Sequence, residues 1–227
     1  MYVMANRDSL KTVAYNYIRE NIIAAHFKAG QPILEQDIAD KLNMSRTPVR
    51  EALKELDAEG LVINYPFQGT IVASISISDV EEISELRQLL EVWALKRSFM
   101  RISDEALDAV ESLFQKAEES NEWEDHQAAD RALHNLIVGQ SGSKWAYTIF
   151  QTIKDQLEWF RNGSVKVTDK ELSRQEHLAI IHAIRERDFR KAEQTLSEHL
   201  SAVKNRFVTA YQGDLGQTAS PSTSVSP

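Results

Sequence analysis

The sequence predicts a mostly α protein of two domains, in which a small N-terminal domain with a β-hairpin precedes a larger all-α bundle. The length predicts the two domains, because 227 residues exceed the usual size of one. Two short β-branched runs occur before residue 76, and no strand pattern follows them. From residue 78 onward, apolar residues recur at helical spacing, with breaks at Ser141-Gly142 and Asn162-Gly163.

Composition and charge exclude several classes of protein. The absence of cysteine removes thiolate zinc sites and cysteine nucleophiles, and it fits a reducing compartment. No apolar run is long enough to span a bilayer and no signal peptide is evident, so we expect a cytoplasmic protein without membrane contact. The net charge is −8, but residues 1–75 carry eight Lys and Arg against nine Asp and Glu. This nearly neutral domain can still bind phosphate if its cations share one face.

Three helices are predicted in the first domain, residues 1–75. The first runs from Asp8 to Phe27, where apolar residues follow the helical period. A shorter helix is expected between Ile33 and Leu42, and it ends at the turn residue Asn43. The third follows after about one turn, with Ser45 as its N-cap and Gly60 as its terminator.

The third helix has an apolar face and a cationic face. Its apolar stripe consists of Val49, Leu53 and Leu56. Arg46, Arg50 and Lys54 follow at intervals of four residues on another face. Taken alone, such a basic stripe is more often only the solvated side of a helix. The preceding short helix and tight turn instead favour a helix-turn-helix, whose second helix enters the major groove of DNA.

A β-hairpin is predicted directly after this helix. Two β-branched runs, Leu61 to Asn64 and Thr70 to Ile75, are joined by Tyr65-Pro66-Phe67-Gln68-Gly69. A hairpin in this position is the wing of a winged helix-turn-helix.

Several segments of this domain form a recognisable pattern: Leu34-Glu35, Ile38-Ala39-Asp40-Lys41-Leu42, Ser45-Arg46-Thr47-Pro48-Val49-Arg50-Glu51-Ala52-Leu53, Glu59-Gly60-Leu61-Val62 and Gly69-Thr70-Ile71-Val72. Through them, residues 10 to 75 resemble the DNA-binding domain of GntR-type bacterial transcription regulators. In that family, the residues matching Arg46, Thr47 and Arg50 contact DNA, and the wing tip matching Gly69 approaches the minor groove. Gln68 departs from the pattern, because many relatives carry Arg there, so the wing brings less charge to DNA. The expected DNA-binding residues are therefore Ser45, Arg46, Thr47, Arg50, Lys54 and Gly69.

The second domain is predicted over residues 78–211. A capping box at Ser78-Asp79-Val80-Glu81 indicates its start. Leu86, Leu90 and Trp93 mark the first amphipathic helix, and Ser103-Asp104 starts the next. Residues 212–227 are rich in Ser, Thr, Gly and Pro, which predicts a disordered tail. Further helical patterns extend over about Trp123 to Gly139, Lys144 to Phe160, Lys170 to Arg187 and Phe189 to Tyr211.

Four polar residues are predicted to point into the core of this bundle. Asp130 and His134 lie at i and i+4 on one helix, while His177 and His199 share apolar faces of two others. A lone histidine on such a face is more often a hydrogen-bonded core residue. Three histidines with a carboxylate instead favour a shared divalent cation, such as zinc, nickel or manganese, with a position open to a ligand. His126 is a less favoured fifth or substitute ligand.

Three segments of the bundle form a second recognisable pattern: Asp130-Arg131-Ala132-Leu133-His134-Asn135-Leu136, Glu176-His177-Leu178-Ala179-Ile180-Ile181-His182-Ala183-Ile184 and His199-Leu200. Through them, residues 78 to 210 resemble the FCD effector domain that accompanies this DNA-binding domain in one GntR subfamily. In that family the positions matching Asp130, His134, His177 and His199 form a metal site, which commonly helps to hold a small organic acid. His182 stands where many relatives have Asp, but its spacing from His177 places it off the inward face. Arg87 matches a usual arginine of the family and is expected to bind an effector carboxylate, although an ion pair with Glu91 is equally consistent with the sequence.

These features together predict a DNA-binding transcription regulator and no enzyme. We expect a repressor whose affinity for operator DNA changes when a small carboxylate effector binds at the metal site. A homodimer is expected, because one helix-turn-helix reads only a few base pairs. Two alternatives remain open: a metal-dependent enzyme acting on a small organic acid, and a constitutive DNA-binding protein with a purely structural metal.

Overall fold

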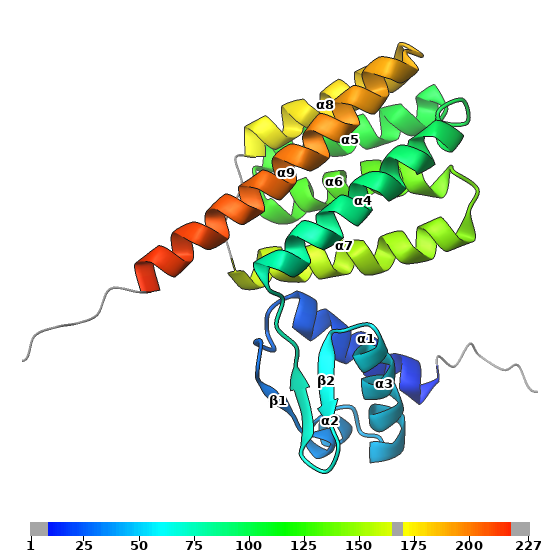
Figure 1. Cartoon of the computed structure of the whole chain (residues 1–227). Helices are drawn as coiled ribbons and strands as arrows, with labels where there is room; N and C mark the ends of the chain where they lie inside the picture. The colour runs from blue at the N-terminus through cyan, green and yellow to red at the C-terminus, as the bar shows by residue number, and fades with distance from the viewer. Residues whose placement is uncertain (1–8, 165–169, 219–227) are drawn as a thin grey trace, which may run out of the picture. The chain divides into compact units, whose positions relative to one another are not determined.

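A computed structural model describes residues 9–164 and 170–218 of the chain. The chain divides into two compact units (Figure 1). The first contains Met1–Ser76 with Asp155–Ser164, and the second contains Ile77–Lys154 with Val165–Pro227. In the described ranges, no helix has both the length and the apolar character needed to cross a membrane.

The N-terminal part of the first unit combines three helices with a small sheet. Strand β3 lies between β1 and β2, and both pairings are antiparallel. The register is fixed by pairs such as Ile33 with Thr70 and Tyr65 with Gly69. The elements are α1 (Leu10–Ile23), β1 (Pro32–Ile33), α2 (Glu35–Lys41), α3 (Arg46–Ala58), β2 (Val62–Tyr65) and β3 (Gly69–Val72).

The core of this unit joins α1 to α3, which lie side by side. The predicted stripe of α3 is confirmed, because Val49, Leu53 and Leu56 are buried. On α1 the buried face consists of Ala14, Ile18 and Ile22, whereas Leu10 and Val13, which fit the same helical period, are exposed.

Strand β1 corrects one sequence-based prediction. Ile33 was expected in the short helix, but it pairs with Thr70 and packs in the core instead. The helix therefore begins only at Glu35. A two-residue strand exists through its pairing with β3, so the sequence of this segment alone carries no signal for it.

Two backbone positions shape the hairpin. Gly60 has φ +75° and ends α3 in the left-handed conformation, in which a glycine has no steric penalty. Phe67, in the loop of the hairpin, has φ +64°. For a residue with a Cβ atom this conformation costs roughly 1–2 kcal/mol, so the wing tip carries local strain.

The second unit is a helical bundle (Figure 1). Helix α4 begins at Ile77, so Ser78 lies inside the helix and is not its expected N-cap. Helix α9 extends to Thr218, so residues 212–218 are helical and do not belong to the expected disordered tail. The rest of the expected tail, 219–227, lies outside the described residues. The helices are α4 (Ile77–Ser98), α5 (Asp104–Ser120), α6 (Trp123–Gly139), α7 (Lys144–Ser164), α8 (Lys170–Arg185) and α9 (Phe189–Thr218), and the last turns of α7 group with the first unit.

Helix α4 departs most from the predicted pattern. Its expected apolar stripe included Leu86 and Trp93, whose exposed fractions are 49% and 43%. The buried face carries Arg87 and Glu91 instead. Helix α4 packs on α6 and α9, so these two charged side chains enter the interior of the bundle.

Candidate metal centre and DNA-binding surface

The predicted DNA-binding side chains of α3 lie on its exposed face. The exposed residues extend from the N-cap along the first turns of the helix, and they are Ser45, Arg46, Thr47, Arg50 and Lys54. Ser45 occupies the N-cap position, but its side chain makes no capping hydrogen bond. The hydroxyl group therefore accepts no hydrogen bond from the backbone N–H groups at the start of α3.

A carboxylate from α2 binds both arginines of this face. Glu35 accepts hydrogen bonds from Nε and Nη2 of Arg46 at 3.2 and 2.9 Å, and from Nε and Nη2 of Arg50 at 2.8 and 2.7 Å. The hydrogen bonds from Arg50, followed by those from Arg46, lower the pKa of Glu35 to about 2 even though partial burial acts against them. Glu35 is thus ionised near neutral pH and aligns two cationic side chains that remain more than half exposed.

The wing supplies an uncharged tip beside this helix. Gly69 is exposed and has φ +104°, and a Cβ atom there would meet nothing within 4 Å. The glycine therefore serves the backbone conformation rather than a close internal contact. Residues 61 to 69 include no Lys or Arg.

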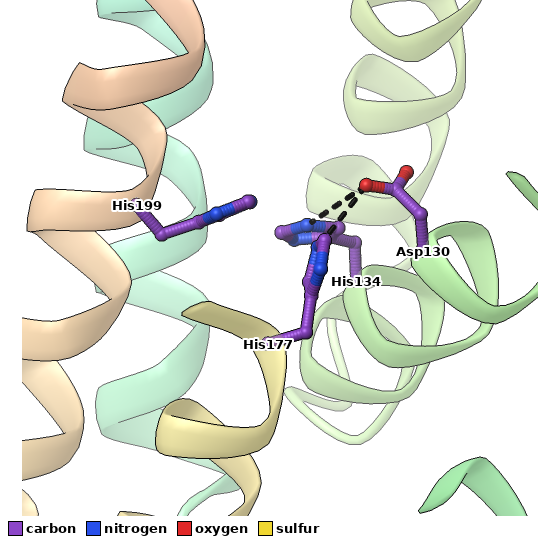
Figure 2. Close-up of side chains that lie close together, drawn as sticks. All are labelled: Asp130, His134, His177 and His199. Atoms are coloured by element: carbon purple, nitrogen blue, oxygen red, sulfur yellow. Dashed lines mark ion pairs between the residues drawn. The ribbon is translucent and has the colours of Figure 1, made fainter. Parts of the chain in front are cut away.

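In the second unit, four predicted side chains from three helices lie together. Asp130 and His134 come from α6, His177 from α8 and His199 from α9, and Figure 2 shows them pointing toward one another. One potential ligand atom from each residue lies within 4.8 Å of those of the other three. His126 is not a member of this group. His182 is exposed, as its spacing predicted.

Burial makes the cluster unusual. The side chains of the three histidines are 1% exposed, whereas that of Asp130 is 27% exposed. Nε2 of His177 lies 3.1 Å from Oδ1 of Asp130, and Nε2 of His134 lies 3.9 Å from the same oxygen (Figure 2). Among the described residues, none of the three Nε2 atoms has a hydrogen-bond partner of good geometry. Of these four side chains, only that of Asp130 is partly open to solvent.

The other ring nitrogen of each histidine is hydrogen-bonded outside the cluster. Nδ1 of His134 lies 2.5 Å from Oε2 of Glu91, and Nδ1 of His199 lies 2.8 Å from Oε2 of Glu176. Nδ1 of His177 lies 2.7 Å from the backbone oxygen of Ser173. All three partners are acceptors, so each neutral ring carries its proton on Nδ1 and turns the Nε2 lone pair inward. This is the tautomer that a metal ligand requires.

Arginines hold the two carboxylates in place. Arg87 Nε donates to Oε1 of Glu91 at 2.5 Å, and this pair is buried. Arg206 donates from Nη1 and Nη2 to the two oxygens of Glu176, each at 2.8 Å. His134 and His199 therefore each stand at the inner end of a chain from arginine through carboxylate to imidazole.

The charges in this region shift several pKa values. Burial alone would raise the pKa of Asp130, but the close approach of the His177 ring and the positive charge of Arg87 hold it well below its usual value. Burial, reinforced by the neighbouring His177, lowers the pKa of His199 to about 3 against the opposing effect of Glu176. An anionic Asp130 and a neutral His199 are the protonation states that suit coordination of a cation.

These donors fit a divalent metal ion. Burying three unpaired imidazole nitrogens costs free energy unless a common partner satisfies them, and a cation at their centre satisfies all three. Three imidazoles with one carboxylate form a donor set for borderline metals such as zinc, nickel or manganese. The exposed side of Asp130 leaves an approach for a further ligand.

One nitrogen of Arg87 is held in an ion pair. Its Nε is paired with Glu91, which is the ion pair that the sequence also allowed. Within the described part of the chain, its terminal amino groups form no hydrogen bond. Its charge also lowers the pKa of Asp130, so it acts on the same site.

Sequence reasoning missed most of the contacts that surround the four clustered side chains, because it allowed the ion pair of Glu91 with Arg87 but not the contact of Glu91 with His134. Glu91 follows Arg87 by one helical turn, and Glu176 directly precedes His177, so both had a local signal. The contact of Arg206 with Glu176 joins α9 to α8, and the contact of Glu35 with Arg50 joins α2 to α3. Such pairings between helices are not visible in the periodicity of either helix.

Comparison with known proteins matches two family models to this chain. The model described as bacterial regulatory proteins of the gntR family matches residues 10–72, and the FCD domain model matches residues 82–202. The HTH-type transcriptional repressor RspR of Escherichia coli (strain K12) is 28% identical over 193 residues, which cover 83% of this chain and 85% of that protein.

Solved structures agree with this assignment of the fold. E. coli McbR/YncC aligns with a TM-score of 0.76 at 20% identity, and the match covers 92% of this chain and 100% of that chain. The metal-free FCD domain of TM0439 aligns with a TM-score of 0.55 at 25% identity over 60% of this chain and 96% of that chain.

Proposed function

Because the chain belongs to the GntR family of transcription regulators with an FCD domain, we propose that it is a repressor controlled by a small carboxylate bound at a metal centre. In this proposal α3 and the wing bind operator DNA, and the effector changes the affinity of that binding. The observation that carries the proposal is the set of three buried histidine Nε2 atoms without partners beside Asp130 and Arg87. RspR, which is named a repressor, supports the direction of regulation.

The proposed DNA contacts follow from exposure and chemistry. Arg46 and Arg50 present guanidinium groups suited to guanine edges or phosphates, and Lys54 extends the cationic stripe. Ser45 and Thr47 add hydroxyl groups at the start of α3, and Gly69 allows close approach of the wing backbone.

The proposed metal is held by Asp130, His134, His177 and His199. When bound, the ion supplies a Lewis-acid position for a carboxylate oxygen. Arg87 is proposed to bind the same effector through its free amino groups while Nε stays with Glu91. An organic acid in this position would contact the metal at one end and Arg87 at the other.

A homodimer is proposed through the exposed face of α4. Leu86, Leu89 and Trp93 lie one turn apart, and their exposed fractions are 49%, 70% and 43%. Neighbouring apolar side chains on one helix favour contact with a second copy, and two copies double the length of DNA that is read. Leu89→Asp should then shift the dimer toward monomer in light scattering, whereas Ile149→Asp on the exposed face of α7 should not.

The test of the regulated function is a binding assay with labelled DNA. Duplexes are first selected by the purified protein from a random library, and their affinity is then measured with a panel of small carboxylates. We expect one class of carboxylate to change the affinity, and we expect this change to disappear after treatment with a chelator or in Arg87→Met. If no carboxylate alters DNA binding while the metal remains bound, the metal is structural and the effector proposal is wrong.

A further inference from the structure

The tip of the wing carries an aromatic side chain in full contact with solvent. The loop between β2 and β3 contains Pro66, Phe67 and Gln68, and Phe67 is 109% exposed. Among the described residues, no other large hydrophobic side chain is as exposed. Its ring buries no apolar surface within the chain, so the hydrophobic effect gives no reason for a phenylalanine here.

The backbone gives no reason for it either. The N–H of Gln68 donates to the backbone oxygen of Tyr65 at 3.1 Å, which closes a four-residue turn. Pro66 occupies the second position of this turn, and Phe67 occupies the third with φ +64°. This is the type II pattern, in which the third position favours glycine or asparagine. The side chain of Phe67 therefore contributes nothing to folding and its backbone conformation costs free energy, and strain of this kind is typical of functional positions.

The composition of the hairpin restricts what the tip can bind. With no Lys or Arg from residue 61 to residue 75, the wing cannot neutralise phosphates. What it offers at its tip is an apolar ring next to the amide of Gln68. The hairpin follows α3 after the single turn at Gly60, so it remains beside the helix that carries the arginines. When α3 lies in the major groove, a neighbouring hairpin reaches the adjacent minor groove, where proteins insert apolar side chains between base pairs.

We propose that Phe67 is a wedge that enters the minor groove of the operator and partly unstacks one base step. The turn directs Phe67 outward before DNA arrives, so the backbone of the wing tip need not rearrange on binding. The wedge would favour pyrimidine–purine steps, because these unstack most readily. It would thus add sequence preference at a position where the protein makes no base-specific hydrogen bond. The proposal rests on the proposed binding of operator DNA by α3.

The test compares Phe67→Gly with the wild type, and the variant is expected to gain stability but to lose affinity for DNA. Glycine removes the strain, so the melting temperature should rise. It also removes the ring, so the dissociation constant for the selected duplexes should increase about tenfold. Phe67→Trp should keep most of the affinity, because it retains an aromatic wedge. Trp145→Ala, which removes a 71% exposed aromatic of the second unit, is the control and should leave the affinity unchanged.

Insertion itself is detected with 2-aminopurine, whose fluorescence rises when it is unstacked. Placed in turn at each step of the selected duplex, it should brighten at one step with the wild type and not with Phe67→Gly. A lower melting temperature for Phe67→Gly would overturn the strain argument. Wild-type affinity in that variant, or a loss of affinity without any fluorescence change in the wild type, would overturn the wedge. If the wild type selects no duplex at all, the proposed DNA binding has failed instead.

Discussion

Arg206 and Glu176 meet through two parallel hydrogen bonds, with each guanidinium amino group 2.8 Å from a different carboxylate oxygen. This two-point contact fixes the plane of the carboxylate, which in turn lies 2.8 Å from Nδ1 of His199. The orientation of a proposed metal ligand thus depends on a residue that does not reach the cluster. Outer partners of this kind affect both the basicity and the aim of an imidazole.

Arg206→Met should therefore weaken metal binding by about ten- to a hundredfold. Competition with a chromogenic chelator would measure this affinity for nickel and for zinc. Lys204→Met is the matched control. Lys204 lies on α9, like Arg206, but it pairs with Glu85 of α4, so its loss leaves Glu176 untouched. Equal metal affinity in Arg206→Met and Lys204→Met would show that the contact does not orient His199.

Metal removal should lower the melting temperature of the wild type. A metal that binds only the folded chain stabilises it by about 2.7 kcal/mol at a hundred times its dissociation constant. A chelator should consequently have almost no effect on the double variant Asp130→Ala, His134→Ala, whereas His182→Ala should respond like the wild type because His182 is exposed. The metal proposal fails if elemental analysis finds no ion in protein supplied with excess zinc, nickel and manganese.

The metal-free protein should lose stability as the pH falls below about 6.5. Burial lowers the pKa of His199 to about 3, compared with 6.5 for an ordinary histidine. Between these values the unfolded chain binds a proton that the folded chain does not, so acid favours unfolding. The contribution of this one group is about 1.4 kcal/mol for each pH unit.

Urea unfolding of chelator-treated protein at several pH values would measure this slope. In His199→Gln the slope between pH 6.5 and pH 4 should be smaller, since the group that titrates only in the unfolded chain is gone. His182→Gln changes an exposed histidine of α8 and serves as the comparison. Identical slopes in the wild type and His199→Gln would contradict the prediction.

Glu35 should set the specificity of the DNA-binding surface. Glu35→Gln removes the charge that aligns Arg46 and Arg50, so affinity for random DNA should rise while the ratio of specific to random binding falls. Asp37→Asn makes the same charge change on α2 at an exposed side chain, and it should raise both affinities together. Anisotropy titrations at matched salt would separate these outcomes. A preserved ratio in Glu35→Gln would show that the arginines need no alignment.

Arg50→Ala should weaken binding to the selected duplex by about ten- to a hundredfold without changing the fold or the metal content. The reason is that Arg50 is exposed on α3 and does not belong to the buried stripe of Val49, Leu53 and Leu56. The salt dependence of binding should also become weaker, because a cation has been lost. If Arg50→Ala binds the selected duplex with wild-type affinity at matched salt, Arg50 does not contribute to the interface with DNA.

The sequence predicted the features that depend only on the spacing of residues within one helix. Asp130 and His134 share a face through their spacing, and His177 and His199 lie on apolar faces of their own helices, so an inward direction could be inferred for each. The same reasoning placed Leu86 and Trp93 inside, where the structure has them exposed. On α4 a buried ion pair occupies the inward face, and apolar periodicity does not anticipate charged residues that compensate each other.

The remainder depended on contacts between segments. Strand β1 exists because Ile33 pairs with Thr70, and Glu35 binds Arg50 because a tight turn brings α2 against α3. The role of Glu176 required Arg206 from another helix. Such relationships are set by the tertiary packing, and a single sequence gives no measure of which distant residues meet.

The three helices that contribute to the cluster also set the order in which it can be completed. His199 lies 69 positions after Asp130, on α9, whereas Asp130 and His134 lie on α6. On the ribosome, a growing chain exposes the α6 pair long before the last imidazole emerges. A complete set of donors therefore exists only after translation has passed α9 and the bundle has closed. A metal ion that needs all four donors could therefore be held only by a molecule whose translation has passed α9.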